Sequence, residues 1–128
     1  MLISLTIPAL HAAYRDGSLT PTALIEELLA RSARYPDHAI WITPPERARL
    51  LDRARELEAH GMDDLPLYGV PFAIKDNIDL AGVPTTCACP DYAYTPQQSA
   101  TVVQKLLDAG AIAMGKTNLD QFATGLNG

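Results

Sequence analysis

The chain has 128 residues, of which 48% are hydrophobic, and its 15 acidic and 10 basic residues give a formal net charge of −5. This length fits one modest domain with a core, and the acidic balance argues against nucleic acid and acidic membranes as partners, because both reward basic patches. No apolar run approaches the roughly 20 residues of a membrane span, and residues 1–10 lack the basic start of a secretory signal, so we expect a cytoplasmic location.

Two helices are predicted at the start of the chain. Leu10, Ala13 and Tyr14 have the i, i+3, i+4 spacing of one helical face, and Gly17 supplies a stop. Thr20-Pro21 then has the residue types of an N-cap followed by the first residue of a helix.

A short, β-rich apolar segment at residues 39–43 predicts a strand after the second helix. Pro44-Pro45 opens a third helix, which Gly61 ends. The charged residues of this helix, between positions 47 and 58, are interpreted as a solvated face rather than a binding patch.

From residue 65 on, the sequence shows strand and turn patterns in place of mainly helical ones. Short apolar runs are bounded there by Gly and Pro, and one amphipathic stretch lies between two of them. The predicted elements are strands at 72–75, 78–80 and 111–115 and a helix at 100–109.

The strand–helix–strand unit within residues 72–115 predicts where a ligand would bind. Crossovers of this kind are right-handed and place the two strands parallel, so both strands end at the same edge of the sheet. Ligands in open α/β sheets bind outside the carboxyl ends of the strands. Lys75 and the turn at residues 116–118 share this edge, and we expect a site there.

Lys75 is the candidate base of that site. An amine at the end of an apolar run must be solvated, paired or neutral, and burial disfavours its ammonium form. A neutral lysine can accept a proton. The alternative is a structural ion pair with Asp76 or Asp79, while Asp76 is also expected to hold its loop through side-chain-to-backbone hydrogen bonds.

No metal or cofactor is implied by the remaining candidate ligands. Cys87 and Cys89 are the cysteines of the chain, and a disulfide between residues this close would be strained, so we interpret them as free thiols. His11, His38 and His60 are scattered, whereas zinc usually takes four ligands.

Residues 110–117 match G-x-x-x-x-G-K-[ST], the pattern of a loop that cradles phosphates. Such a loop follows a strand and precedes a helix, but here a helix comes before it and the four intervening residues are apolar. We interpret the match as accidental and Lys116 as a strand-end lysine paired with a nearby acid. Nucleotide binding stays open as an alternative of a different class, as does an interaction module.

Several motifs in register resemble the amidase signature family across residues 65–128. The resemblance is carried by residues 69–77 (GVPFAIKDN), 82–86 (GVPTT), 100–103 (ATVV) and 115–118 (GKTN). It implies an α/β fold, of which this chain would be an incomplete N-terminal portion with a mixed sheet flanked by helices. Residues 1–64 would form the mainly helical N-terminal part and residues 65–128 the start of the α/β core.

Within that family, the chain is most similar to the allophanate hydrolase branch, through residues 85–90, 92–96 and 118–126. The main competitor is the A subunit of the glutamyl-tRNA(Gln) amidotransferase. That branch usually has Ser-Lys where this chain has Cys89-Pro90, and Met-Asp-Glu-Phe-Ala-Met-Gly where residues 119–125 read Leu-Asp-Gln-Phe-Ala-Thr-Gly. A generic amidase of unknown substrate also remains open.

The resemblance implies a Ser–cis-Ser–Lys triad that hydrolyses a small-molecule amide, with Lys75 as the base. Thr124 and Gly125 would line a substrate wall or have a role at a helix end. Both serines of the triad lie beyond Gly128 in the family, so residues 1–128 alone are expected to be inactive. The family also implies a homodimer to which residues 8–60 would contribute.

Overall fold

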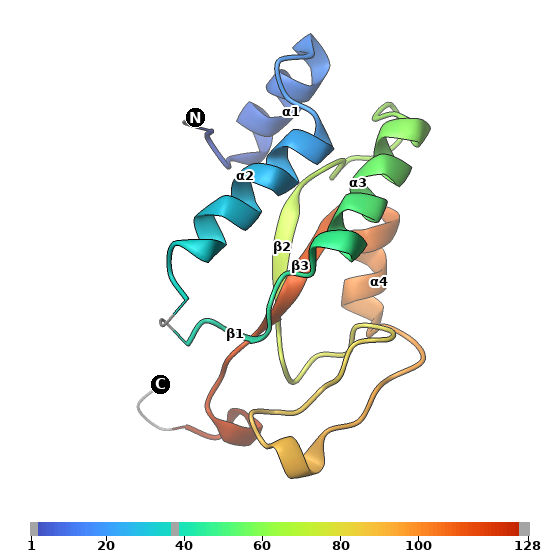
Figure 1. Ribbon diagram of the computed structural model, residues 1–128. Coiled ribbons are helices and arrows are strands. Elements are labelled where there is room, and N and C mark those ends of the chain that lie inside the picture. Colours follow the sequence, from blue (N-terminus) through green and yellow to red (C-terminus); the bar gives the residue numbers. More distant parts are fainter. Residues whose placement is uncertain (1–2, 37–38, 126–128) are drawn as a thin grey trace.

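The computed structural model describes residues 3–36 and 39–125, so His38 lies outside the described residues. Figure 1 shows how the helices and strands are arranged. The helices are α1 (Ile7–Asp16), α2 (Pro21–Ala33), α3 (Arg47–His60) and α4 (Thr101–Asp108), the strands are β1 (Trp41–Thr43), β2 (Pro71–Lys75) and β3 (Ile112–Thr117), and two short 3₁₀ turns are η1 (Pro90–Tyr92) and η2 (Gln121–Ala123).

The first two helices begin with side-chain caps. The Thr6 hydroxyl accepts a hydrogen bond from Ala9 N at 3.3 Å, and the Thr20 hydroxyl accepts one from Ala23 N at 3.1 Å. Pro21 opens α2, and Gly17 ends α1 with a φ of 80°, a left-handed conformation that suits glycine. The predicted boundaries at Gly17 and Thr20-Pro21 are therefore confirmed.

Replacing Thr20 with alanine is expected to lower the free energy of unfolding by about 1 kcal/mol, because the Ala23 amide would lose its acceptor. Urea denaturation followed by circular dichroism measures this change. Thr101→Ala is the matched control, since Thr101 is an exposed first-turn residue of α4, whose N-cap forms no side-chain bond. Equal losses in both variants would contradict a capping role for Thr20.

The sheet is mixed, with strand order β1-β3-β2. β2 pairs parallel with β3, and β1 pairs antiparallel with β3, so the predicted parallel unit and mixed sheet are confirmed. The strand predicted at residues 78–80 is wrong. Leu80 forms only an isolated bridge with Val83, because the backbone turns there and Gly82 N donates to Pro96 O.

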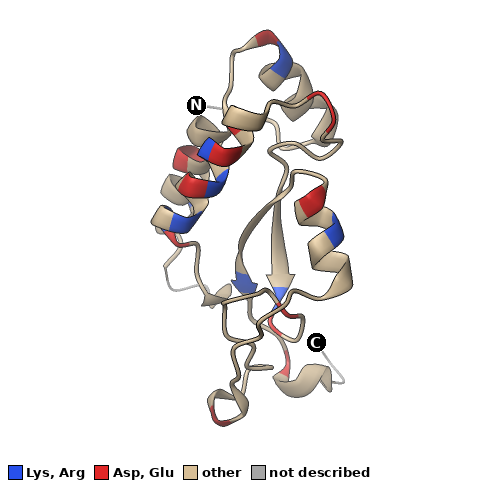
Figure 2. Ribbon diagram, turned by 90° about the vertical axis from the view of Figure 1, so that its right-hand side faces the viewer, with Lys and Arg blue, Asp and Glu red and all other residues tan. Residues whose placement is uncertain are grey.

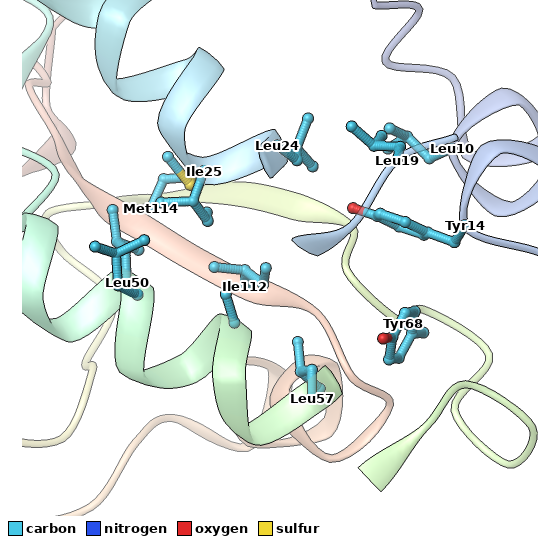
Figure 3. Packing of buried hydrophobic residues seen from close by; sticks show 12 residues of the cluster. Leu10, Tyr14, Leu19, Leu24, Ile25, Leu50, Leu57, Tyr68, Ile112 and Met114 are labelled. Atoms are coloured by element: carbon cyan, nitrogen blue, oxygen red, sulfur yellow. The ribbon is translucent and has the colours of Figure 1, made fainter. Parts of the chain in front are cut away.

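Two apolar clusters cover the two faces of the sheet. Successive residues of a strand point to opposite faces, so Ile112 and Met114 of β3 face one cluster and Ala113 faces the other. The larger cluster receives α1, α2 and α3 (Figure 3). The smaller one is formed with α4 through Val103. The sheet edge that carries Lys75 is thus held by packing on both sides.

The charged face of α3 is largely solvated, as predicted, because Arg47, Asp52, Arg55, Glu56 and Glu58 are exposed; Arg49 and Arg53 are the half-buried exceptions. Arg53 Nη2 donates to Leu107 O at 2.7 Å and to Ala111 O at 3.1 Å, and Arg49 Nη2 donates to Met114 O at 3.3 Å. Helix spacing alone does not reveal these contacts, because their acceptors are backbone carbonyls about sixty residues along the chain. Both arginines tie α3 to the segment that holds β3.

No described helix is long and apolar enough to cross a membrane. Within residues 3–36 and 39–125, His, Cys, Asp and Glu side chains form no group of three or more that could hold a metal ion.

Candidate functional site

The carboxyl ends of β2 and β3 lie side by side, with Lys75 opposite Thr117 in the parallel register. Figure 2 shows the basic residues at these two strand ends at the same edge of the sheet. Outside this edge is an open hollow of about 500 Å³. Its walls are Lys75, Asn118, Leu119, Asp120, Ala123 and Gly125.

Lys75 is held by its backbone, while its side chain is exposed at the wall of the hollow. Two hydrogen bonds to β3 bracket it: the Thr117 hydroxyl donates to Ile74 O at 3.4 Å, and Asp76 N donates to Thr117 O at 3.1 Å. The predicted alternative, an ion pair of Lys75 with Asp76 or Asp79, is not formed within the described part of the chain. A local ion pair therefore does not explain why Lys75 stands at the end of this strand.

Asp76 instead pairs with Lys116 in the interior. Both side chains are fully buried, and Lys116 Nζ lies 2.7 Å from Asp76 Oδ1, which accepts no other hydrogen bond from the described residues. Lys116 Nζ also donates to Thr85 Oγ1 at 3.2 Å and to Pro84 O at 3.3 Å. This arrangement confirms that Lys116 is a strand lysine paired with a nearby acid.

The structure of residues 112–117 argues against the phosphate-loop match. Residues 112–117 are the strand β3, with β1 on one side and β2 on the other. A Cβ added at Gly115 would lie 2.6 Å from Thr43 O, so this glycine permits the close approach of β1. A segment that runs as a paired strand does not form the loop that surrounds a phosphate, so the interpretation of the match as accidental is supported.

Asp76 also holds the loop that follows β2, as the sequence predicted. Asp76 Oδ2 accepts from Thr86 N at 3.0 Å and from the Thr86 hydroxyl at 2.5 Å, and Asp76 O accepts from Cys87 N at 3.1 Å. The loop is itself hydrogen-bonded to a later segment, because Cys87 O accepts from Phe122 N at 2.9 Å. Asp76 is thereby connected to η2, whose Ala123 lines the hollow.

The two segments joined in this way have unusual backbone conformations. Cys87 and Ala88 have φ of 53° and 62°, and Phe122 and Ala123 have φ of 54° and 57°. Non-glycine residues rarely adopt this left-handed region, and each instance costs about 1 kcal/mol or more. Such strain persists where surrounding contacts over-determine the backbone and is frequent at functional sites.

The three predicted site residues occupy different positions. Lys75 and Gly125 share the hollow, and an added Cβ at Gly125 would collide with the Asp120 carboxyl. The Thr124 hydroxyl donates to Gln121 O at 2.8 Å, at the end of η2. A substrate contact of Thr124 or Gly125 remains a prediction. The sequence analysis missed Leu119, Asp120 and Ala123, although their place just after β3 could have indicated them.

An exposed aromatic cluster lies beside η2. The ring of Tyr92 meets Tyr94 and Phe122 edge-on, at centroid distances of 5.7 Å and 5.2 Å. The Tyr94 hydroxyl donates to Asp79 Oδ1 at 2.6 Å. This hydrogen bond, followed by desolvation and by the charges of Asp79 and Tyr92, raises the pKa of Tyr94 to about 12.

Because the folded protein favours the protonated phenol, the contact of Tyr94 with Asp79 stabilises the fold below the ordinary pKa of tyrosine and is lost as the pH rises from about 10 to about 12. The ultraviolet difference titration between the native chain and Tyr94→Phe should show a phenolate step near pH 12. In an Asp79→Asn background the same step should move towards about pH 10. A native step already near pH 10 would show that the hydrogen bond does not form.

Known proteins share the segment that carries this site. The family model described as Amidase matches residues 23–128. Urea amidolyase of Saccharomyces cerevisiae is 50% identical over 114 residues, which are 88% of this chain and 6% of that protein. The A subunit of the mitochondrial glutamyl-tRNA(Gln) amidotransferase of Ornithorhynchus anatinus is 42% identical over 128 residues, which are 97% of this chain and 24% of that protein.

A solved structure also resembles this chain. Allophanate hydrolase of Kluyveromyces lactis superposes with a TM-score of 0.74 at 44% identity, covering 88% of this chain and 19% of that chain. The chain therefore spans a quarter or less of the length of these relatives.

Proposed function

Because the chain belongs to the amidase family, whose model covers residues 23–128, we propose that it supplies the lysine side of a site that hydrolyses amides, with allophanate as the substrate. The products would be ammonia and carbon dioxide. The observation that carries the proposal is the position of Lys75, at the carboxyl end of a parallel strand and in the wall of a hollow. The substrate is suggested by the similarity to the Kluyveromyces lactis allophanate hydrolase.

In the proposed mechanism, neutral Lys75 accepts the proton of a bridging serine hydroxyl. That serine in turn takes the proton of a second serine, whose oxygen attacks the amide carbonyl. The proton held by Lys75 returns through the bridging serine to the leaving nitrogen, so that ammonia departs as the acyl-enzyme forms. Water then hydrolyses the acyl-enzyme, and the released N-carboxycarbamate decarboxylates to carbon dioxide and a second ammonia. No described serine lines the hollow, so in this proposal both hydroxyls come from protein outside residues 1–128.

The proposal also requires Lys75 to be desolvated. Its side chain is exposed among the described residues, so water must be excluded from it in the complete site. The same additional protein that brings the serines would cover the hollow and remove water from the amine. The polypeptide of residues 1–128 by itself is accordingly proposed to lack hydrolase activity.

A chimera tests this function. Residues 1–128 would replace the matching segment of the Kluyveromyces lactis allophanate hydrolase, and ammonia release from allophanate would be measured. We expect turnover by the chimera and none by the 128-residue polypeptide. A folded chimera without turnover would contradict the proposal, and so would turnover by the isolated polypeptide.

The A subunit of the amidotransferase remains the second candidate, because the similarity to it spans 97% of this chain, against 88% for urea amidolyase. The equivalent chimera in that protein, tested for ammonia release from glutamine, distinguishes the two. Activity in the amidotransferase host alone would replace allophanate by glutamine as the proposed substrate.

A further inference from the structure

Both carboxylates that flank Lys75 in the sequence are engaged elsewhere. Asp76 lies against Lys116, at 2.7 Å. Asp79 Oδ1 accepts hydrogen bonds from the Thr85 hydroxyl at 2.9 Å and from the Tyr94 hydroxyl at 2.6 Å. The chain thus places two acids within four residues of the candidate base and gives each of them another partner.

This matters because a carboxylate close to a lysine favours its charged form. A lysine held as ammonium by a neighbouring acid has no lone pair with which to accept a proton. Asp76 is the carboxylate nearest to Lys75 in the sequence, and it is fully buried, where charges are poorly screened.

We propose that Lys116 is a positioning residue that neutralises Asp76, so that Asp76 can hold the site's backbone without holding Lys75 in its charged form. The inference rests on the proposed function only in taking Lys75 as the base. It assigns a reason to a buried ion pair that the mechanism itself does not use. It also explains why a lysine, rather than an apolar residue, stands inside β3.

The hydrogen bonds of Asp76 explain why an acid is present at all. Its Oδ2 atom holds Thr86, and its carbonyl holds Cys87. The Cys87 carbonyl in turn holds Phe122, the neighbour of Ala123 in the wall of the hollow. An ionised Asp76 needs a counter-ion, and Lys116 provides a charge that Lys75 would otherwise provide.

The other charges around Lys75 do not replace this pairing. Asp120 belongs to the loop after β3 and lies in the wall of the hollow, with its carboxyl beside Gly125. Within the described residues it forms no ion pair with Lys75. Lys105 lies on the exposed side of α4 and is outside the hollow.

Competitive acylation of amines tests the inference on the 128-residue chain, without any need for catalysis. Acetic anhydride reacts with the uncharged amine, so the rate at a fixed pH reports how often Lys75 is neutral. Mass spectrometry separates the lysines of the chain, which are Lys75, Lys105 and Lys116. Lys105 is exposed and serves as the internal reference.

In Lys116→Met we expect the Lys75/Lys105 rate ratio at about pH 8 to fall at least threefold. A rise of one unit in the pKa of an amine lowers its uncharged fraction about tenfold at a pH well below that pKa. Asp76→Asn in the same background should restore the native ratio, because the uncompensated carboxylate is gone. Lys116→Arg should leave the ratio unchanged, because the counter-charge is kept. A purely structural ion pair would alter stability and leave all these ratios equal.

Equal ratios in native, Lys116→Met and Lys116→Met/Asp76→Asn chains would overturn the inference, as would a double variant as slow as the single one. If circular dichroism shows that Lys116→Met is unfolded, Lys116→Gln decides, because its amide keeps a hydrogen-bond donor beside Asp76 but carries no charge. The Lys75 rate, relative to that of Lys105, should then fall at least threefold below the native value. An unchanged rate would then overturn the inference.

The two proposals can fail separately. A chimera without turnover would refute the proposed function and leave the acylation ratios as they are. An active chimera together with unchanged ratios would refute the role of Lys116 alone.

Discussion

Replacing Lys75 with alanine in the active chimera is expected to lower kcat/KM for amide hydrolysis by about 10²–10⁴, the usual contribution of a positioned base. Lys75→Arg should be equally damaging, because a guanidinium keeps the positive charge but does not release its proton. The arginine variant thus separates proton transfer from simple charge attraction. Steady-state kinetics of ammonia release measure both effects.

Stability distinguishes this loss from unfolding. The Lys75 side chain is exposed and forms no ion pair in the described residues, so its removal should change the free energy of unfolding by less than about 0.5 kcal/mol. Lys105→Ala, on the exposed side of α4, is the matched control and should retain native kinetics. If Lys75→Arg kept native kcat/KM, Lys75 could not be the base.

Replacing Lys116 with methionine is expected to lower the free energy of unfolding of the 128-residue chain by about 3–5 kcal/mol, because it leaves a buried carboxylate without its counter-ion. A domain is typically stable by only about 5–15 kcal/mol, so most of the stability would be lost. Urea denaturation followed by circular dichroism gives the value.

The partner substitution should recover much of that loss. Asp76→Asn added to Lys116→Met removes the buried charge and retains an acceptor for Thr86, so the double variant should be more stable than Lys116→Met. Lys105→Met, at an exposed position, should change stability by no more than about 0.5 kcal/mol. Additive losses at residues 76 and 116 would show that the two charges do not interact.

Local signals were the most predictable part of the fold. Caps at Thr20 and a stop at Gly17 act within a few residues, so they can be read from the sequence. The parallel pairing of β2 and β3 followed from the handedness of the crossover, and this pairing brought Lys75 beside the end of β3. The edge at which the hollow lies was therefore predictable.

The partners of charged side chains were not predictable, because they depend on register between segments far apart in the chain. The sequence offers Asp76 and Asp79 as nearby acids for Lys75, whereas the sheet register brings Lys116 beside Asp76. Arg53 likewise reaches carbonyls of Leu107 and Ala111 that no helical spacing reveals. The short extended run at 78–80 was misread because its residues turn before a partner strand can form.

The strand order has a consequence for how the chain folds during synthesis. Of the three strands in the described residues, β3 is made last but occupies the middle of the sheet, between β1 and β2. The two earlier strands are not neighbours, so these three strands cannot begin to pair before Ile112–Thr117 has emerged from the ribosome. Until then the first three helices lack Ile112 and Met114 of the cluster in which they pack, and a nascent chain stalled before this strand would be a substrate for chaperones.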